Sequence, residues 1–182
     1  MRSNIARLLN RYLKPKEEIV ASQLVAGIGC GPMVDLIGSV LCDEGGAFII
    51  PEPYYGGFNS DLATKACVDV VPVGHVEDDV LGVTEEMLEE VYAKNKETVK
   101  GIIIANPNNP FGRTYTTEQL YVFINFCHKH NLHFISDEIY ALSIFSDTLD
   151  GKKADFVSVT SLDLPDPSKV HVLYGLSKDF CM

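Results

Sequence analysis

The chain has 182 residues, of which 46% are hydrophobic and 22% charged, a composition typical of one globular domain with a sizeable core. Its formal net charge of −10 argues against nucleic acid as a partner, because phosphates require a basic face. No apolar run reaches membrane-spanning length. The five cysteines are odd in number and scattered, which predicts reduced thiols in a cytoplasmic protein.

The first forty residues predict two helices and one short strand. Apolar residues at positions 5, 8, 9, 12 and 13 form a helical stripe that Pro15 ends. Residues 23–26 are predicted as a short strand leading into a glycine-rich turn. Pro32 suits the first turn of a helix, and the apolar pattern continues that helix to residue 41.

The middle of the chain alternates buried strands with helices. Residues 47–50 are a strand that follows a glycine pair, and residues 58–66 are predicted as a helix. Residues 68–73 form the next strand. Thr84 caps an acidic-headed helix that we expect to end near residue 96.

The last eighty residues repeat this order of elements. Residues 101–105, 132–136 and 170–174 are predicted strands, and residues 156–159 are a weaker strand candidate. Thr116 and Gln119 form a capping box for a helix reaching about residue 130. Helices that separate apolar strands predict an α/β fold with a mainly parallel sheet flanked by helices.

Four groups of polar or glycine-rich residues follow predicted strands. In open α/β sheets, ligands bind outside the carboxyl ends of the strands, so these groups are the candidate site. Each group taken singly has a structural explanation, such as a proline-rich turn, a helix cap, core tyrosines or a surface lysine. Together they supply an amine, a carboxylate, phenols and an amide, and the glycine-rich start of the helix at residues 29–31 adds backbone N–H groups. The four segments are Pro51–Phe58, Asn106–Gly112, Asp137–Tyr140 and Gly175–Lys178.

This constellation resembles the fold-type I pyridoxal-phosphate enzymes of the class I and II aminotransferase family. The segments Pro-Glu-Pro-Tyr-Tyr-Gly-Gly-Phe, Asn-Pro-Asn-Asn-Pro-Phe-Gly and Ser-Asp-Glu-Ile-Tyr are most similar to the branch of 1-aminocyclopropane-1-carboxylate synthase-like proteins. The resemblance extends from about Leu24 to Phe180. It implies a pyridoxal 5'-phosphate cofactor, an amino-acid substrate and a homodimer, with either transamination or elimination as the reaction.

The resemblance also implies roles for individual residues. Lys178 would bond covalently to the cofactor aldehyde, and Asp137 would keep the pyridine nitrogen protonated. Tyr140 and Asn109 would hydrogen-bond the phenolic oxygen of the cofactor, and Tyr55 would stack on its ring. The phosphate would lie at the helix start formed by Gly29, Cys30 and Gly31, where Ser177 adds a hydroxyl.

The family pattern continues beyond this sequence, to an arginine that binds the cofactor phosphate and another that binds the substrate carboxylate. We therefore expect residues 1–182 to be the central part of the large, cofactor-binding domain, without the small C-terminal domain. This expectation predicts a chain that is inactive alone. A non-catalytic protein of the same fold, with an interaction or regulatory role, is the alternative.

Two other sites are weaker interpretations. Gly27 and Gly29 before a helix suggest a dinucleotide-binding loop, but the third glycine of that motif would fall at Pro32. Cys127 and the histidines near residue 130 suggest zinc, but a fourth ligand at a recognisable spacing is missing. The helix dipole explains histidines at a helix end, so no metal site is predicted.

Overall fold

The computed structural model describes residues 1–74, 81–144 and 156–182. In these residues five strands form one sheet in the order β2-β1-β3-β4-β5, and every neighbouring pair is parallel. The α/β fold with a parallel sheet is therefore confirmed. The strands are β1 (Ala47–Pro51), β2 (Asp69–Val73), β3 (Val99–Ala105), β4 (His133–Asp137) and β5 (Val170–Leu173).

The predicted capping signals begin the helices as expected. The Thr116 hydroxyl accepts from Gln119 N at 3.3 Å, and Gln119 Oε1 accepts from Thr116 N at 2.9 Å, which completes the capping box. Thr84 accepts from Met87 N at the start of the acidic-headed helix. The helices are α1 (Arg2–Leu13), α2 (Cys30–Leu41), α3 (Gly57–Ala63), α4 (Glu85–Asn95), α5 (Thr117–Lys129) and α6 (Leu176–Phe180).

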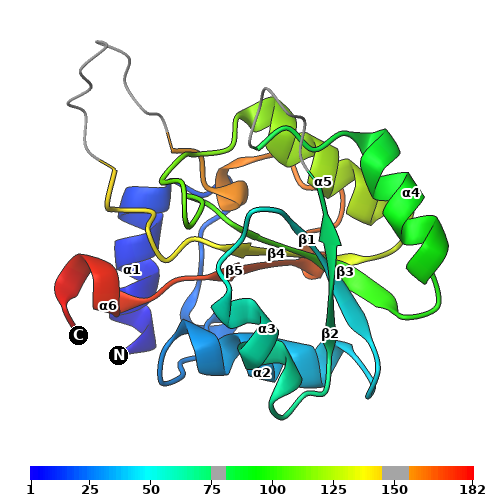
Figure 1. Cartoon of the computed structure of the whole chain (residues 1–182). Helices are drawn as coiled ribbons and strands as arrows, with labels where there is room; N and C mark the ends of the chain where they lie inside the picture. The colour runs from blue at the N-terminus through cyan, green and yellow to red at the C-terminus, as the bar shows by residue number, and fades with distance from the viewer. Residues whose placement is uncertain (75–80, 145–155) are drawn as a thin grey trace.

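The sheet is the middle layer of three, with α4 and α5 on one face and α2 and α3 on the other (Figure 1). Alternate residues of a strand point to opposite faces. Ile102 accordingly packs in the cluster with α4 and α5, whereas Ile103 packs with α2 and α3. Among the described residues, no helix is long and apolar enough to cross a membrane.

Two predicted strands are wrong. Residues 21–23 form a 3-10 helix, and residues 24–26 are irregular, because Gln23 Oε1 accepts from Val20 N and folds the segment onto itself. Residues 156–158 are also irregular, and a 3-10 helix (Val159–Ser161) follows. Here the Asn106 amide donates to Val157 O, and Glu138 accepts from Val159 N. Distant side chains thus bind backbone groups that a strand would offer to its neighbour.

The order of the strands determines where a ligand can bind. The chain passes outward from β1 to β2 and then returns through β3 to β4 and β5. The order reverses between β1 and β3, and in parallel sheets such a reversal opens a crevice at the carboxyl ends of the strands. All four segments singled out in the sequence lie at that edge.

Candidate functional site at the carboxyl edge of the sheet

A cavity of about 260 Å³ lies at the carboxyl ends of β3, β4 and β5, against the first turn of α2. We call it the edge cavity. Of the nine residues predicted for the site, all but Gly29 line it, and they come from five separate segments of the chain. The lining residues are Cys30, Gly31, Val34, Tyr55, Phe58, Asp61, Ala105, Asn109, Asp137, Ile139, Tyr140, Ser177 and Lys178.

The start of α2 forms one side of the edge cavity. Gly29 is the residue before the helix, and its φ of 111° lies in a region that side chains disfavour, so a glycine is required there. The first N–H groups of a helix lack partners within it and carry the positive end of its dipole. Burial, and then the neighbouring Asp137, raise the pKa of the Cys30 thiol to about 12, so this thiol is neutral.

Asp137 ends β4 at the floor of the cavity. Its side chain is 7% exposed, and its Oδ1 accepts from Ile139 N at 3.1 Å. Burial is the main reason that its pKa rises from 3.8 to about 6, and the nearby Asp61 carboxylate raises it further. A buried carboxylate with one weak internal partner is well suited to bind a cationic ring N–H.

Lys178 and Tyr140 meet at the mouth of the cavity. The Lys178 Nζ lies 5.5 Å from the centroid of the Tyr140 ring. Lys178 lies in the short helix α6, which begins directly after Gly175. Ser177 and Lys178 are exposed, so the amine is accessible from outside.

Tyr55 forms the opposite wall. Its ring contacts Phe58 edge-on, with centroids 5.6 Å apart and planes at 84°. A Cβ atom at Gly57 would lie 2.3 Å from Tyr55 ring atoms, so the glycine leaves the space that the ring occupies. Tyr55 is 45% exposed, which leaves much of its ring free of protein contacts.

The three asparagines of the Asn-Pro-Asn-Asn-Pro segment have different environments. Asn106 is fully buried and accepts from Tyr115 N, and Asn108 is 4% exposed and donates to Pro53 O. Both therefore hold the loop in place. Asn109, the asparagine selected from the sequence, lines the edge cavity.

Sequence reasoning missed five lining residues, of which Asp61 is chemically the most important. A Cβ atom at Gly31 would lie 3.1 Å from Asp61 Oδ1, so this carboxylate lies against the first turn of α2. Burial and the nearby Asp35 raise the Asp61 pKa. The sequence could have indicated Asp61 through its position one helical turn after Phe58, which places both residues on the same face of α3.

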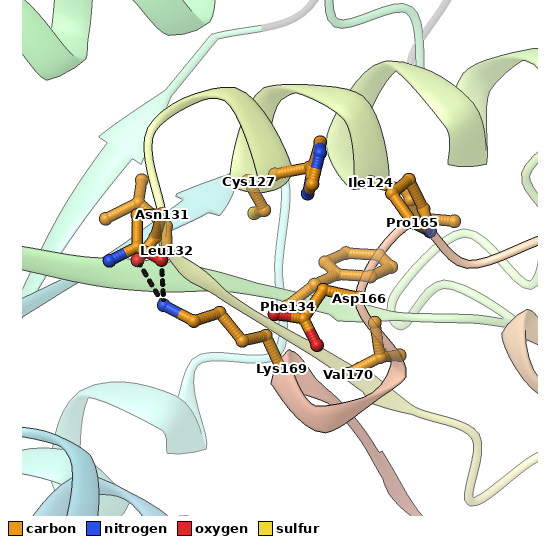
Figure 2. Close-up of a pocket in the computed structure, with 10 residues that line it drawn as sticks. Ile124, Cys127, Asn131, Leu132, Phe134, Pro165, Asp166, Lys169 and Val170 are labelled. Atoms are coloured by element: carbon orange, nitrogen blue, oxygen red, sulfur yellow. Dashed lines mark hydrogen bonds between the residues drawn. The ribbon is translucent and has the colours of Figure 1, made fainter.

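A smaller cavity of about 100 Å³ lies between the C-terminal end of α5 and the segment before β5 (Figure 2). Lys169 Nζ donates to Asn131 O at 2.7 Å and to Asn131 Oδ1 at 2.5 Å, which ties this segment to the end of α5. The thiol of Cys127 is buried here, and burial raises its pKa. None of the residues predicted for the site lines this cavity.

The histidines considered for zinc are bonded elsewhere. His130 Nε2 lies 2.8 Å from Glu89 Oε1, and His133 Nδ1 lies 3.0 Å from His171 Nε2. Within the described ranges, no group of three or more potential metal ligands is found.

Comparisons with known proteins agree on one family. The family described as "Aminotransferase class I and II" matches residues 1–182. "Probable inactive 1-aminocyclopropane-1-carboxylate synthase-like protein 2" of Homo sapiens is 35% identical over 191 residues, covering 99% of this chain and 33% of that relative. "1-aminocyclopropane-1-carboxylate synthase-like protein 1" of Mus musculus is 35% identical over 193 residues, covering 100% of this chain and 37% of that relative.

A solved structure shares the fold. The aromatic aminotransferase of Pyrococcus horikoshii superposes with a TM-score of 0.80 at 25% identity, over 100% of this chain and 45% of that one. The chain thus spans about a third of the length of these curated relatives and less than half of the solved structure.

Proposed function

Because the chain belongs to the class I and II aminotransferase family, we propose that its edge cavity binds pyridoxal phosphate for chemistry on the amino group of an amino acid. One observation carries the proposal. Eight residues selected from motifs as far apart as Cys30 and Lys178 line a single cavity. Members of this family generally use that cofactor, and the chain would supply Lys178 as the amine that bonds to it.

The residues present fit the cofactor. Val34, Phe58 and Ala105 supply apolar walls for an aromatic ring, and Asp137 supplies a carboxylate at the floor. The open first turn of α2 supplies N–H groups for a phosphate. When bound, the cofactor supplies an electron sink for a carbanion at the substrate Cα.

Five side chains of the edge cavity have a task in this proposal. Asp137, as an anion, would hold a proton on the ring nitrogen. Tyr140 and Asn109 would donate hydrogen bonds to the phenolic oxygen, and Tyr55 would lie over the ring face. The amine of Lys178 would be placed to move a proton at the substrate Cα.

The charge of the edge cavity supports a second candidate, a non-catalytic protein of the same fold. Lys178 is the only cation among its described lining residues, whereas Asp61 and Asp137 are both acidic. A phosphate dianion would therefore rely on backbone N–H groups and the Ser177 hydroxyl. The Homo sapiens relative is itself named "probable inactive". Under this candidate the cavity keeps the cofactor for stability or for binding a partner.

The covalent site can be tested directly. The full 182-residue chain is incubated with pyridoxal phosphate, reduced with borohydride and mapped by peptide mass spectrometry. We expect the pyridoxyl group on Lys178, with Lys178→Ala abolishing it and Lys65→Ala, at an exposed site, leaving it unchanged. Label spread over surface lysines, or none at Lys178, would refute the assignment.

Turnover then tests the enzyme candidate. Amino-group transfer and elimination are measured across a panel of amino acids with added cofactor. Saturable turnover that Lys178→Ala abolishes supports the enzyme, with transamination and synthase-type elimination distinguished by their products. Labelling at Lys178 without turnover is the result expected both of the non-catalytic candidate and of a chain that is inactive alone.

We also propose that residues 1–182 are part of the large, cofactor-binding domain and that the protein forms a homodimer in the cytoplasm. Ile28, just before α2, is 91% exposed, and Val40, in the last turn of α2, is 72% exposed; both supply apolar surface for a second copy. The five described cysteines are all unpaired, in keeping with a reducing compartment. Analytical ultracentrifugation of the chain, with Val40→Glu as the disrupting variant, tests the dimer.

A further inference from the structure

The helix that carries Lys178 has little to hold it in place. α6 contains five residues, none of them buried, and the residue before it, Gly175, provides no side-chain cap. Phe180 is 45% exposed, so apolar packing anchors the helix weakly. A side chain on such a helix is positioned only if another contact sets the rotation of the helix about its axis.

Asp179 makes two contacts that can do this. Its Oδ2 accepts from Tyr174 Oη at 2.9 Å, and its Oδ1 accepts from Ser143 Oγ at 2.8 Å. The two hydroxyls come from the end of β5 and from the turn that follows β4. One carboxylate thus joins α6 to two separate parts of the carboxyl edge, and we call this arrangement the Asp179 clamp.

Both donors of the clamp are themselves fixed. Tyr174 packs in a cluster with Leu9 and Leu13 of α1. Burial, and then the bond to Asp179, raise the pKa of its phenol, so it remains a donor. Ser143 N donates to Tyr140 O at 3.0 Å, which places Ser143 in the same turn as Tyr140. The clamp therefore ties the helix of Lys178 to the turn of Tyr140.

We propose that Asp179 is a positioning residue that sets the Lys178 amine relative to Tyr140 and the edge cavity. The proposal rests on the proposed function, in which these two side chains bind the same cofactor. Asp179 does not line the cavity and acts through α6. We therefore expect its effect to depend on the two hydroxyls.

The first measurement uses the cofactor-free chain and reports on α6 itself. In Asp179→Ala, amide hydrogen exchange in the peptide covering residues 176–182 should become about tenfold faster, equivalent to about 1.4 kcal/mol. Asp179→Asn should stay near the unaltered protein, because an amide keeps one acceptor and its N–H can bond to a hydroxyl oxygen. Glu44→Ala is the matched control, because Glu44 is an exposed carboxylate before β1, at the amino ends of the strands and far from α6.

The second measurement reports on the amine. After reaction with pyridoxal phosphate and borohydride, the label at Lys178 relative to that at the exposed Lys65 should fall about tenfold in Asp179→Ala. With acetaldehyde, which senses exposure alone, the same ratio should not change. A merely destabilised helix would alter both ratios in the same way.

A mutant cycle decides whether the effect passes through the clamp. In a Ser143→Ala/Tyr174→Phe background, Asp179→Ala should add less than about twofold to either measurement. A full effect in that background, or unchanged exchange and labelling in Asp179→Ala, would overturn the proposal. If pyridoxal phosphate fails to label Lys178 in the unaltered chain, the proposed function fails, whereas the exchange measurement still decides the clamp.

Discussion

Replacing Asp137 by asparagine should stabilise the cofactor-free protein at neutral pH while removing the charge that the proposed cofactor needs. The Asp137 carboxyl is 7% exposed, and burial with the nearby Asp61 raises its pKa from 3.8 to about 6. The folded state therefore binds more protons than the unfolded state between these two pH values. The contribution of Asp137 to the stability of the unaltered protein must therefore fall as pH rises through this window.

The magnitude follows from the pKa difference. About two pH units correspond to about 3 kcal/mol of stability that is present below pH 3.8 and absent above pH 6. The asparagine side chain of the variant would keep the acceptor for Ile139 N and has no charge to bury. The stability gain of Asp137→Asn should thus grow by about 3 kcal/mol from the acid side of the window to neutral pH.

Urea unfolding of both proteins without cofactor, followed by circular dichroism at intervals from pH 3.5 to pH 8, measures this gain. Glu138→Gln is the matched control, because Glu138 is fully buried, its pKa is raised to about 7, and its carboxylate bonds Val159 N away from the edge cavity. The stability gain of Glu138→Gln should grow between pH 4.5 and pH 7, and labelling of Lys178 by pyridoxal phosphate should not change. A stability gain of Asp137→Asn that does not vary with pH would refute the reasoning.

Three further changes test other parts of the site. Asp61→Asn should tighten pyridoxal phosphate binding by about two- to fivefold, because the partly exposed Asp61 carboxylate, which repels the cofactor phosphate, is removed. In absorbance titrations, binding of phosphate-free pyridoxal should not change. Asn106→Ala should cost about 2–3 kcal/mol in urea unfolding, since a fully buried side chain and its two hydrogen bonds are lost; a cost below 1 kcal/mol would contradict this role. Gly57→Ala should weaken cofactor binding as much as Tyr55→Ala does, because the added methyl group displaces the Tyr55 ring, and the double variant should be no weaker than either one.

The sequence by itself determined the parallel α/β fold and the selection of the candidate residues. Both depend on local patterns. Apolar runs such as residues 101–105 become buried strands in almost any α/β context, and the residues that follow them necessarily gather at one edge of the sheet. For that reason Asp137 and Lys178 could be placed together without knowledge of the strand order.

The tertiary structure alone decided the features that depend on contacts between distant segments. Residues 156–159 have the composition of a strand, but the side chains of Asn106 and Glu138 bind the backbone groups that pairing would need. Asp61 shares a face of α3 with Phe58, but it reaches the edge cavity only because α3 packs beside the start of α2, and that packing is not encoded locally. The Asp179 clamp likewise joins three segments, so the position of the Lys178 helix follows from their packing rather than from any local pattern.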